Sequence, residues 1–153
     1  MAQASKSWKI FASGLILLIA AVSVRGFIRQ FGGETQNEVV WKPLPGPGKK
    51  CPLDGDLFFT YEFSEKPKMG TVVLIVKVFD KSKTQVGPFA ITGRSDMPSM
   101  KGAHDSGEVD FKLNKKNDYL MPVHVAMPGE WEVRLTFFKE GKPVFRGSLK
   151  FNA

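Results

Sequence analysis

Cysteine is almost absent from this sequence, since Cys51 is the only one among 153 residues. A single cysteine excludes an internal disulfide and any metal cage built from several thiolates. We expect Cys51 to be a free thiol, and the alternatives are an intermolecular disulfide or a metal contact completed by a partner.

The motifs of common enzymes are absent as well. The chain has two histidines, His104 and His124, and it shows no Ser-His-Asp order, no glycine-rich phosphate loop and no HExxH zinc motif. Several acids fall in predicted loops without pairing on one element, and such side chains most often form a solvated rim. They are Asp96, Asp105, Glu108 and Asp110. We therefore predict that the protein is not an enzyme.

Positive charge is in excess but is not gathered in one patch. The formal net charge is +7, from 22 Lys and Arg against 15 Asp and Glu. Lys6, Lys9 and Arg25 lie in the first 25 residues, which contain no acid. The remaining excess is too diffuse to indicate nucleic-acid binding, so we predict no nucleic-acid partner.

One long uncharged run lies near the N-terminus, from Ile10 to Val24. It is rich in Ile, Leu, Ala and Val, which is typical of an export signal. As a helix it would rise about 22 Å, short of the roughly 30 Å hydrocarbon layer, although Lys9 and Arg25 could snorkel. We predict one N-terminal hydrophobic helix, with residues 1–25 acting as a signal anchor or a signal peptide.

Two features bear on whether this signal is cleaved. Ala21-Val22-Ser23 resembles a small-x-small cleavage site, whereas Arg25 and Arg29 follow it directly, which is more usual for an uncleaved anchor. We favour the anchor, which makes the membrane a partner of the N-terminal helix and places the rest of the chain in the periplasm or at the cell exterior. Secretion after cleavage is the alternative.

Residues 26–50 show no hydrophobic period and become rich in proline and glycine between Pro43 and Gly48. This composition is typical of a semi-extended linker, so we predict a Pro/Gly-rich tether between the membrane and a folded domain. The Val-Val-Trp segment at residues 39–41 could still add a short edge strand.

Residues 51–153 alternate apolar and polar side chains with the period of β-strands. The clearest alternation lies at 57–63, 131–137 and 145–151. Between the last two, Gly141 can supply the positive φ that a hairpin turn requires. These features predict antiparallel strands in a single folded domain.

The remaining strands are shorter or less clearly patterned. Residues 71–79 are apolar at almost every position, which favours a central strand buried on both faces. Further strands are expected at 87–93, 109–113 and 119–126. About seven strands and no amphipathic helix predict an all-β fold, an antiparallel immunoglobulin-like β-sandwich. Its expected core contains Phe59, Val76, Val78, Val123, Val125, Trp131, Val133 and Leu135.

Three segments carry a resemblance to a known family. They are Met-Pro-Ser-Met at 97–100, Tyr-Leu-Met-Pro-Val at 119–123 and Met-Pro-Gly-Glu-Trp-Glu-Val at 127–133. In type and spacing they resemble the YtkA-like domain, which is related to FixH, over residues 55–151. The resemblance implies a membrane-tethered, extracytoplasmic immunoglobulin-like domain, often found near copper-transport or cytochrome-oxidase assembly functions. It does not imply an enzyme.

Two thioethers and an imidazole lie close together in the sequence, at Met97, Met100 and His104. Thioether sulfur prefers Cu(I) and neutral imidazole accepts either copper state, whereas zinc asks for thiolates or more imidazoles and calcium for many oxygens. We predict that these three residues form a loop site for copper, as Cu(I). Possible additional ligands are Met127, Met121 and His124.

Two other interpretations stay open. Met97 and Met100 could close one end of the core, because methionine fills irregular gaps. The domain could also be a metal-free docking module for a membrane protein complex, with exposed basic residues such as Lys112 and Lys150 meeting an acidic partner. If copper binds, the expected task is copper handling or assembly of a copper-containing membrane complex, and the partner would be that complex or a copper protein.

Overall fold

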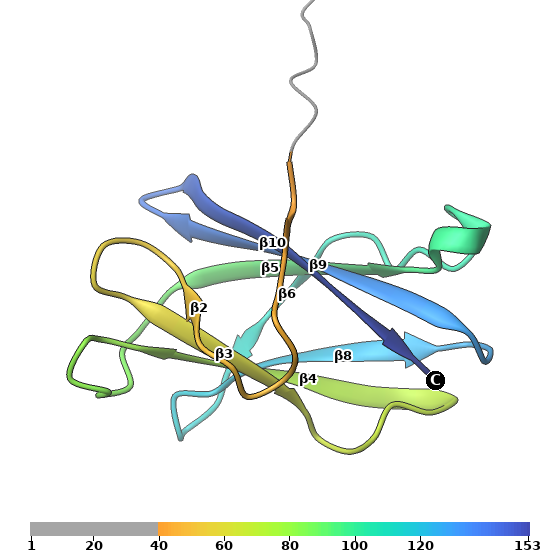
Figure 1. Cartoon of the computed structure of the whole chain (residues 1–153), viewed down its shortest axis with the longest axis horizontal. Coiled ribbons are helices and arrows are strands. Elements are labelled where there is room, and N and C mark those ends of the chain that lie inside the picture. The colour runs from red at the N-terminus through yellow and green to blue at the C-terminus, as the bar shows by residue number, and fades with distance from the viewer. Residues whose placement is uncertain (1–39) are drawn as a thin grey trace, which may run out of the picture. The chain divides into compact units, whose positions relative to one another are not determined.

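The computed structural model describes residues 40–153 of the chain. The predicted N-terminal helix and the part of the tether before Val40 lie outside the described residues. This part of the chain is built from strands and one short 3-10 helix, η1 (Figure 1). The elements are β1 (Lys42–Pro43), β2 (Cys51–Pro52), β3 (Phe58–Phe63), β4 (Gly70–Phe79), β5 (Ala90–Asp96), η1 (Pro98–Met100), β6 (Val109–Asp110), β7 (Lys112–Leu113), β8 (Tyr119–Val125), β9 (Glu130–Lys139) and β10 (Lys142–Asn152).

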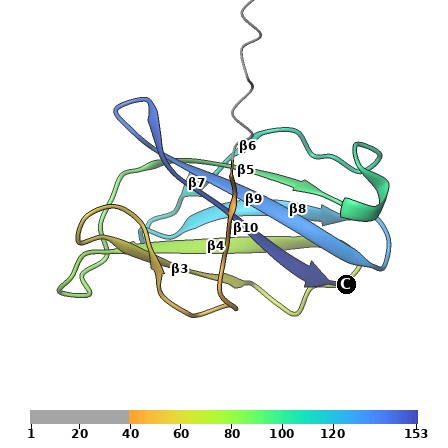
Figure 2. The same cartoon turned by 45° about the horizontal axis from the view of Figure 1, so that its top comes forward.

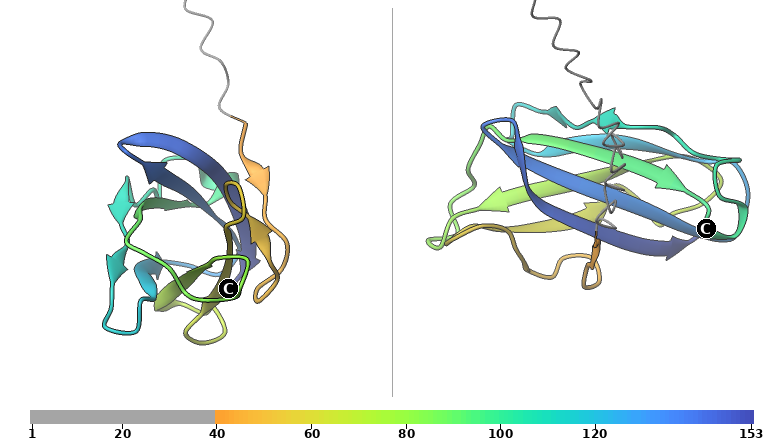
Figure 3. Two further views of the ribbon diagram at one scale, coloured as in Figure 1. Left: turned by 90° about the vertical axis from the view of Figure 1, so that its left-hand side faces the viewer. Right: turned by 90° about the horizontal axis from the view of Figure 1, so that it is seen from above.

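The strands form two five-stranded sheets that lie face to face as two layers (Figure 3). The first sheet has the order β1-β10-β9-β5-β6, and the second sheet has the order β2-β3-β4-β8-β7. Neighbouring strands are antiparallel, except that β1 runs parallel to β10. The prediction of an all-β, mainly antiparallel sandwich is therefore confirmed.

The core lies between the facing sides of the two sheets. Every second residue of the long strands points into it, so that Trp131 and Phe137 of β9 are fully buried. The Phe59 ring, from the second sheet, packs on the Phe137 ring of the first sheet with centroids 4.7 Å apart. The residues predicted for the core are all buried: Phe59, Val76, Val78, Val123, Val125, Trp131, Val133 and Leu135.

Strand β4 departs from the sequence prediction on one of its faces. It is central in the second sheet, as predicted, and it buries alternate residues such as Val72 and Leu74. On the opposite face Val73, Ile75 and Phe79 are half-buried, and no strand or helix of residues 40–153 lies over them. The prediction of burial on both faces is wrong because a two-layer sandwich covers each sheet on one side.

The strand predicted at 109–113 is two strands that belong to different sheets. β6 pairs with β5 in the first sheet, and β7 pairs with β8 in the second. Phe111 lies between them, and its N–H donates to the Ile91 carbonyl at 2.9 Å. Gly93 leaves space for its ring, since a Cβ there would lie 2.9 Å from Phe111. β5 itself starts later than predicted, because Pro88 has no N–H to donate to a neighbouring strand.

The end of the predicted tether packs against the sandwich. β1 extends the first sheet beside β10, and the Leu44 N–H donates to the Ser148 carbonyl at 2.7 Å. The Tyr61 hydroxyl donates to the Pro45 carbonyl at 2.6 Å, which fixes the proline-rich segment to β3. The folded part of the chain thus includes β1, and the edge strand lies just after residues 39–41.

Candidate functional site

The predicted site loop and the β8–β9 turn meet at one end of the sandwich. η1 lies at the same end as this turn in both views (Figures 1 and 2). The register of the strands explains the proximity, because Asp96 at the end of β5 pairs with Glu132, the residue after Trp131. Met97 therefore begins the loop beside Trp131.

Asp96 organises the start of this loop. Its carboxylate accepts the N–H of Met97 at 2.8 Å and the N–H of Gly102 at 3.2 Å. Between these two points Pro98 opens η1, and the Met100 N–H donates to the Met97 carbonyl at 3.0 Å. One acidic side chain thus holds both ends of the methionine-containing turn.

The far side of the loop is tied to β5 and carries His104. The next residue, Asp105, accepts the Arg94 Nε–H at 2.7 Å, and this bond is the largest cause of the lowered pKa of the Asp105 carboxyl. The Ser106 N–H then donates to the Ser95 carbonyl at 2.9 Å. His104 is therefore carried at a defined position next to an anchored carboxylate.

Three of the predicted ligands lie around Trp131 and the turn before it. The His104 ring lies against the Trp131 ring, with centroids 6.0 Å apart. The Met97 side chain is 4% exposed, and its methyl group reaches Gly129, where an added Cβ would lie 2.9 Å from it. Met127 packs on the core, and its carbonyl accepts the Trp131 Nε1–H at 3.1 Å. The fold thus brings the His104 imidazole to the Trp131 indole and places Met97 and Met127 at the turn that precedes this indole.

The other predicted ligands have different surroundings. Met100 is 44% exposed on η1 whereas Met97 is buried, so the two methionines of the predicted loop site are not equivalent. Met121 is fully buried inside the core. His124 is exposed on the outer face of the second sheet, as strand alternation predicts, with its Nδ1 3.5 Å from the Thr71 hydroxyl.

Sequence reasoning assigned Trp131 to the core and missed its place beside the site. The sequence feature that could have indicated this place is the spacing of Met127 and Trp131, which lie four residues apart on either side of the turn before β9. The indole N–H bonds back across this interval to the Met127 carbonyl. A residue that belongs to the core thus also fixes the turn that carries Met127 and contacts the His104 ring.

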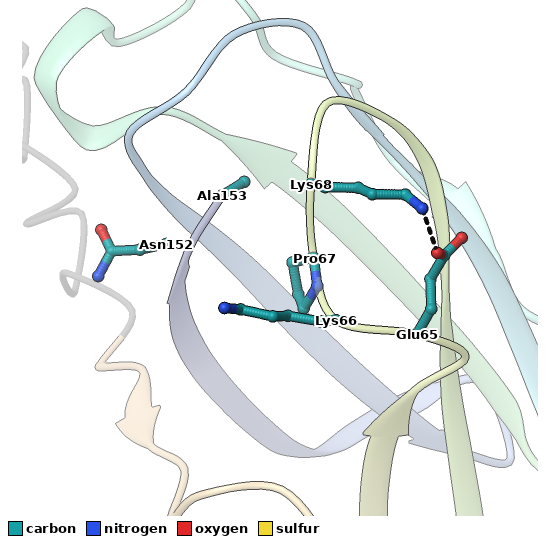
Figure 4. A pocket seen from close by; sticks show the side chains of 6 residues that line it. All are labelled: Glu65, Lys66, Pro67, Lys68, Asn152 and Ala153. Carbon is teal, nitrogen blue, oxygen red and sulfur yellow. Dashed lines mark ion pairs between the residues drawn. The ribbon is translucent and has the colours of Figure 1, made fainter.

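An open hollow of about 520 Å³ lies at the same end of the sandwich (Figure 4). It adjoins the β8–β9 turn, because the N–H and carbonyl of Ala153 bond to Gly129. The Lys68 ammonium pairs with the Glu65 carboxylate at 2.6 Å, and both side chains are largely exposed. Its lining is Glu65, Lys66, Pro67, Lys68, Asn152 and Ala153. It contains neither sulfur nor imidazole and is distinct from the candidate metal ligands.

Two further observations concern residues 40–153. In this range no three His, Cys, Asp or Glu side chains are grouped so that they could hold a metal ion. Nor does any helix described there have the length and apolar character needed to cross a membrane.

Cys51 is a free thiol buried in the core, with 1% of its surface exposed. Its S–H donates to the Lys49 carbonyl at 3.6 Å. Burial raises the pKa of the thiol to about 11, so the nucleophilic thiolate is scarce at neutral pH. The folded domain therefore does not present Cys51 to a partner or to an oxidant.

Because of the buried thiol, the free energy of unfolding should depend on pH in the alkaline range. Between pH 9 and about 11 the unfolded chain loses the Cys51 proton and the folded domain keeps it, so the free energy of unfolding should fall as pH rises. The loss reaches about 2 to 3 kcal/mol. Burial also raises the pKa of Tyr61, to about 12, which extends the loss to higher pH. Urea unfolding at pH 8 and at pH 10.5 measures the effect.

The control for this prediction is Cys51→Ala, which removes the titrating thiol and keeps Tyr61. This variant should lose less stability than the parent chain between the two pH values. Parallel losses in the two proteins would show that Cys51 titrates normally and is not shielded by the fold.

The fold and the site define a two-layer β-sandwich domain with thioether and imidazole groups gathered at one end. No model of a known protein family matches the chain, and a search of curated proteins finds no relative. The resemblance to the YtkA-like domain therefore rests on the sequence segments that carry it.

Proposed function

We propose that this protein is a non-enzymatic, membrane-anchored domain outside the cytoplasm that takes up copper as Cu(I) and passes it on. In this proposal the sandwich is of the immunoglobulin-like, YtkA-like kind, and the receiver is a copper protein or a copper-containing membrane complex under assembly. The observation that carries the proposal is that His104, Met97 and Met127 lie at one end of the sandwich, around Trp131 and the turn before it.

The types of donor favour Cu(I). Thioether sulfur is a soft ligand and neutral imidazole a borderline one, and this pair suits Cu(I) better than it suits zinc or calcium. Thioethers also keep their ligand character in oxidising compartments, where thiols form disulfides. Burial withdraws Cys51 from such a role, so Met and His side chains are the soft donors available in residues 40–153.

The unequal exposure of the donors supports transfer more than storage. Met100 is exposed and His104 is half-buried, so an arriving ion meets these two groups first. Met97 lies behind them and can turn towards the ion, because methionine has three rotatable side-chain bonds. A site that gains one neutral ligand at a time binds weakly and releases the ion by ligand exchange.

A Cu(I) titration of the full chain tests the proposal. The chain carries carbon-13 methyl labels on methionine and is titrated under reducing, oxygen-free conditions. The methyl signals of Met97 and Met100, and the His104 ring protons, should shift and saturate near one equivalent of copper. The Met127 methyl should shift if this side chain completes the site.

The methyl of Met121 is the internal control, because it is sealed in the core and should not move. An equal amount of Zn²⁺ should leave the methionine methyls in place, since zinc does not favour thioether ligands. Equal shifts of every exposed methionine without saturation would mean that copper binds without a site, and the proposal would be abandoned.

One observation favours a second candidate function, that of a metal-free docking module. On the outer face of the second sheet, Phe58 stacks on Phe79 with ring centroids 5.3 Å apart, and Val73 and Ile75 lie further along the same face of β4, beyond Lys77. Apolar side chains grouped on a surface are typical of binding sites for other proteins. Under this candidate, Ile75→Lys would abolish recovery of the membrane partner and would leave the affinity for Cu(I) unchanged.

A further inference from the structure

A second hollow, of about 410 Å³, lies on the outer face of the first sheet. This hollow is separate from the candidate metal ligands. Its strand residues come from the middle of β5 and β9 and from β10, whereas Met97 follows the end of β5. Its volume falls within the range of small-molecule sites in proteins. Its lining residues are Trp41, Thr92, Glu108, Thr136, Phe138 and Arg146.

Strand register explains why polar groups meet there. Thr92 of β5 pairs with Thr136 of β9, and Thr136 pairs with Arg146 of β10. On the other side Thr92 pairs with Asp110 of β6. Neighbouring strands lie about 4.8 Å apart, so one row across the sheet carries a carboxylate, two hydroxyls and a guanidinium in succession.

Aromatic side chains flank this polar row. Trp41, which precedes β1, places its ring over the Arg134 guanidinium, 5.9 Å from the ring centroid. Phe138 lies one outward position along β9 from Thr136 and lines the same hollow. The site thus combines two flat apolar surfaces with a few polar groups, which is the usual composition of a small-ligand site.

Two polar groups in the hollow have no partner among the residues that the structure describes. The Thr92 hydroxyl oxygen is buried and makes no hydrogen bond within this part of the chain. A buried hydroxyl without a partner is costly, and native structures rarely keep one without a reason. Thr92 also lines the hollow, and rotation about χ1 to another staggered position would break no hydrogen bond within residues 40–153.

Arg146 is the other such group. Within residues 40–153 no carboxylate lies within ion-pair distance of it, although Arg94 and Arg134 on neighbouring strands are each paired. Glu108, at the other side of the hollow, is likewise outside the ion pairs of this part of the chain. A guanidinium offers donors and a carboxylate offers acceptors, so the hollow presents both kinds of group.

This mixture of charges selects the class of ligand. A net anion would be repelled by Glu108, and a net cation by Arg146. A neutral ring with several hydroxyls can donate to the Glu108 carboxylate, accept from the Arg146 guanidinium and do both with the two threonines. Its flat C–H face can pack on the Trp41 indole. We infer that this hollow is a binding site for a neutral carbohydrate.

The test titrates the full chain with neutral hexasaccharides of β-1,4-glucose, α-1,4-glucose and β-1,4-N-acetylglucosamine. The detergent is zwitterionic and has no sugar headgroup, so that it does not compete. Nitrogen-15 indole signals report binding. At least one sugar should shift the Trp41 signal and saturate it, while the buried Trp131 signal stays in place.

Two variants assign the binding to the hollow. Thr92→Val keeps the shape of the side chain and removes the hydroxyl, and it should weaken binding about tenfold. Trp41→Ala should reduce binding below detection. The matched control is Thr60→Val, on the outer face of the second sheet, which should bind like the parent chain. Thermal unfolding of Thr92→Val should be unchanged or raised, because no hydrogen bond within residues 40–153 is lost.

The inference is overturned if none of the three neutral sugars gives a saturable shift, or if Thr92→Val binds as tightly as the parent chain. Binding of an acidic sugar such as oligogalacturonate without binding of the neutral ones would also overturn it. Because copper is absent from every sample, these outcomes are independent of the proposed copper function.

Discussion

Replacing Trp131 by Ala should lower the free energy of unfolding by about 3 to 5 kcal/mol. Trp131 is the largest fully buried side chain of the core, and its removal leaves a cavity between the two sheets. The variant also loses the hydrogen bond from the indole N–H to the Met127 carbonyl. Urea unfolding of the full chain, followed by circular dichroism, measures the change.

Two further variants separate the causes of this loss. Trp131→Phe keeps most of the apolar volume and loses the hydrogen bond, so it should cost less than the alanine variant. Trp41→Ala removes a half-buried tryptophan at the sheet surface and should cost about 1 kcal/mol or less. If all three variants lost equal stability, Trp131 would not be the centre of the core.

The double substitution Met97→Leu plus Met100→Leu should reduce the affinity for Cu(I) by a hundredfold or more. Loss of a residue that merely orients a metal ligand costs about 10- to 100-fold in affinity, and here two thioether ligands are lost. The fold should survive, because replacing the buried Met97 by Leu conserves volume and costs less than about 1.5 kcal/mol. Competition with a Cu(I) chelator gives the affinity.

Two single variants, one in the site and one outside it, test this prediction further. Met100→Leu changes an exposed side chain, so it should leave stability nearly unchanged and still weaken binding. Met121→Leu is the matched control, because it alters a buried methionine away from the loop and should leave the affinity for copper intact. Equal copper affinity in the parent chain and the double variant would remove the thioether site from the account.

The long strands are predictable from sequence because one face of each must be apolar. In β9 and β10 this constraint gives alternation over most of their length, and Glu140 and Gly141 between them take the positive φ values, 52° and 74°, of a two-residue hairpin turn. The same pattern cannot predict β1, β2, β6 and β7, because these strands have two residues each and are too short to show a period. For β4 the pattern predicts the strand but not the burial of its outer face, because apolar residues there do not reveal whether anything covers them.

The candidate site is predictable in the types of its residues and not in their arrangement. Local spacing identifies Met97, Met100 and His104 as neighbours in the chain. Their surroundings depend on the pairing of β5 with β9, which is a long-range contact, and this pairing buries Met97 beside Trp131 while η1 turns Met100 outward. Sequence spacing alone holds no information about that register.

The hollow beneath Trp41 shows the same limit. Trp41, Thr92 and Arg146 are far apart in the sequence, and none belongs to a recognisable motif. They meet because β10 carries Arg146 opposite Thr136, because β5 carries Thr92 opposite the same residue, and because β1 adds a parallel strand at the edge. A site assembled across four strands becomes visible only when their register is known.

X-ray absorption at the copper edge of the Cu(I)-loaded full chain tests the central claim most directly, because it identifies the atoms bound to the metal. At one equivalent of copper the account predicts both sulfur and imidazole nitrogen in the coordination shell, with fewer sulfur ligands in the Met97→Leu plus Met100→Leu variant. Copper bound by nitrogen and oxygen without sulfur, or an unchanged sulfur count in the double variant, would contradict the account.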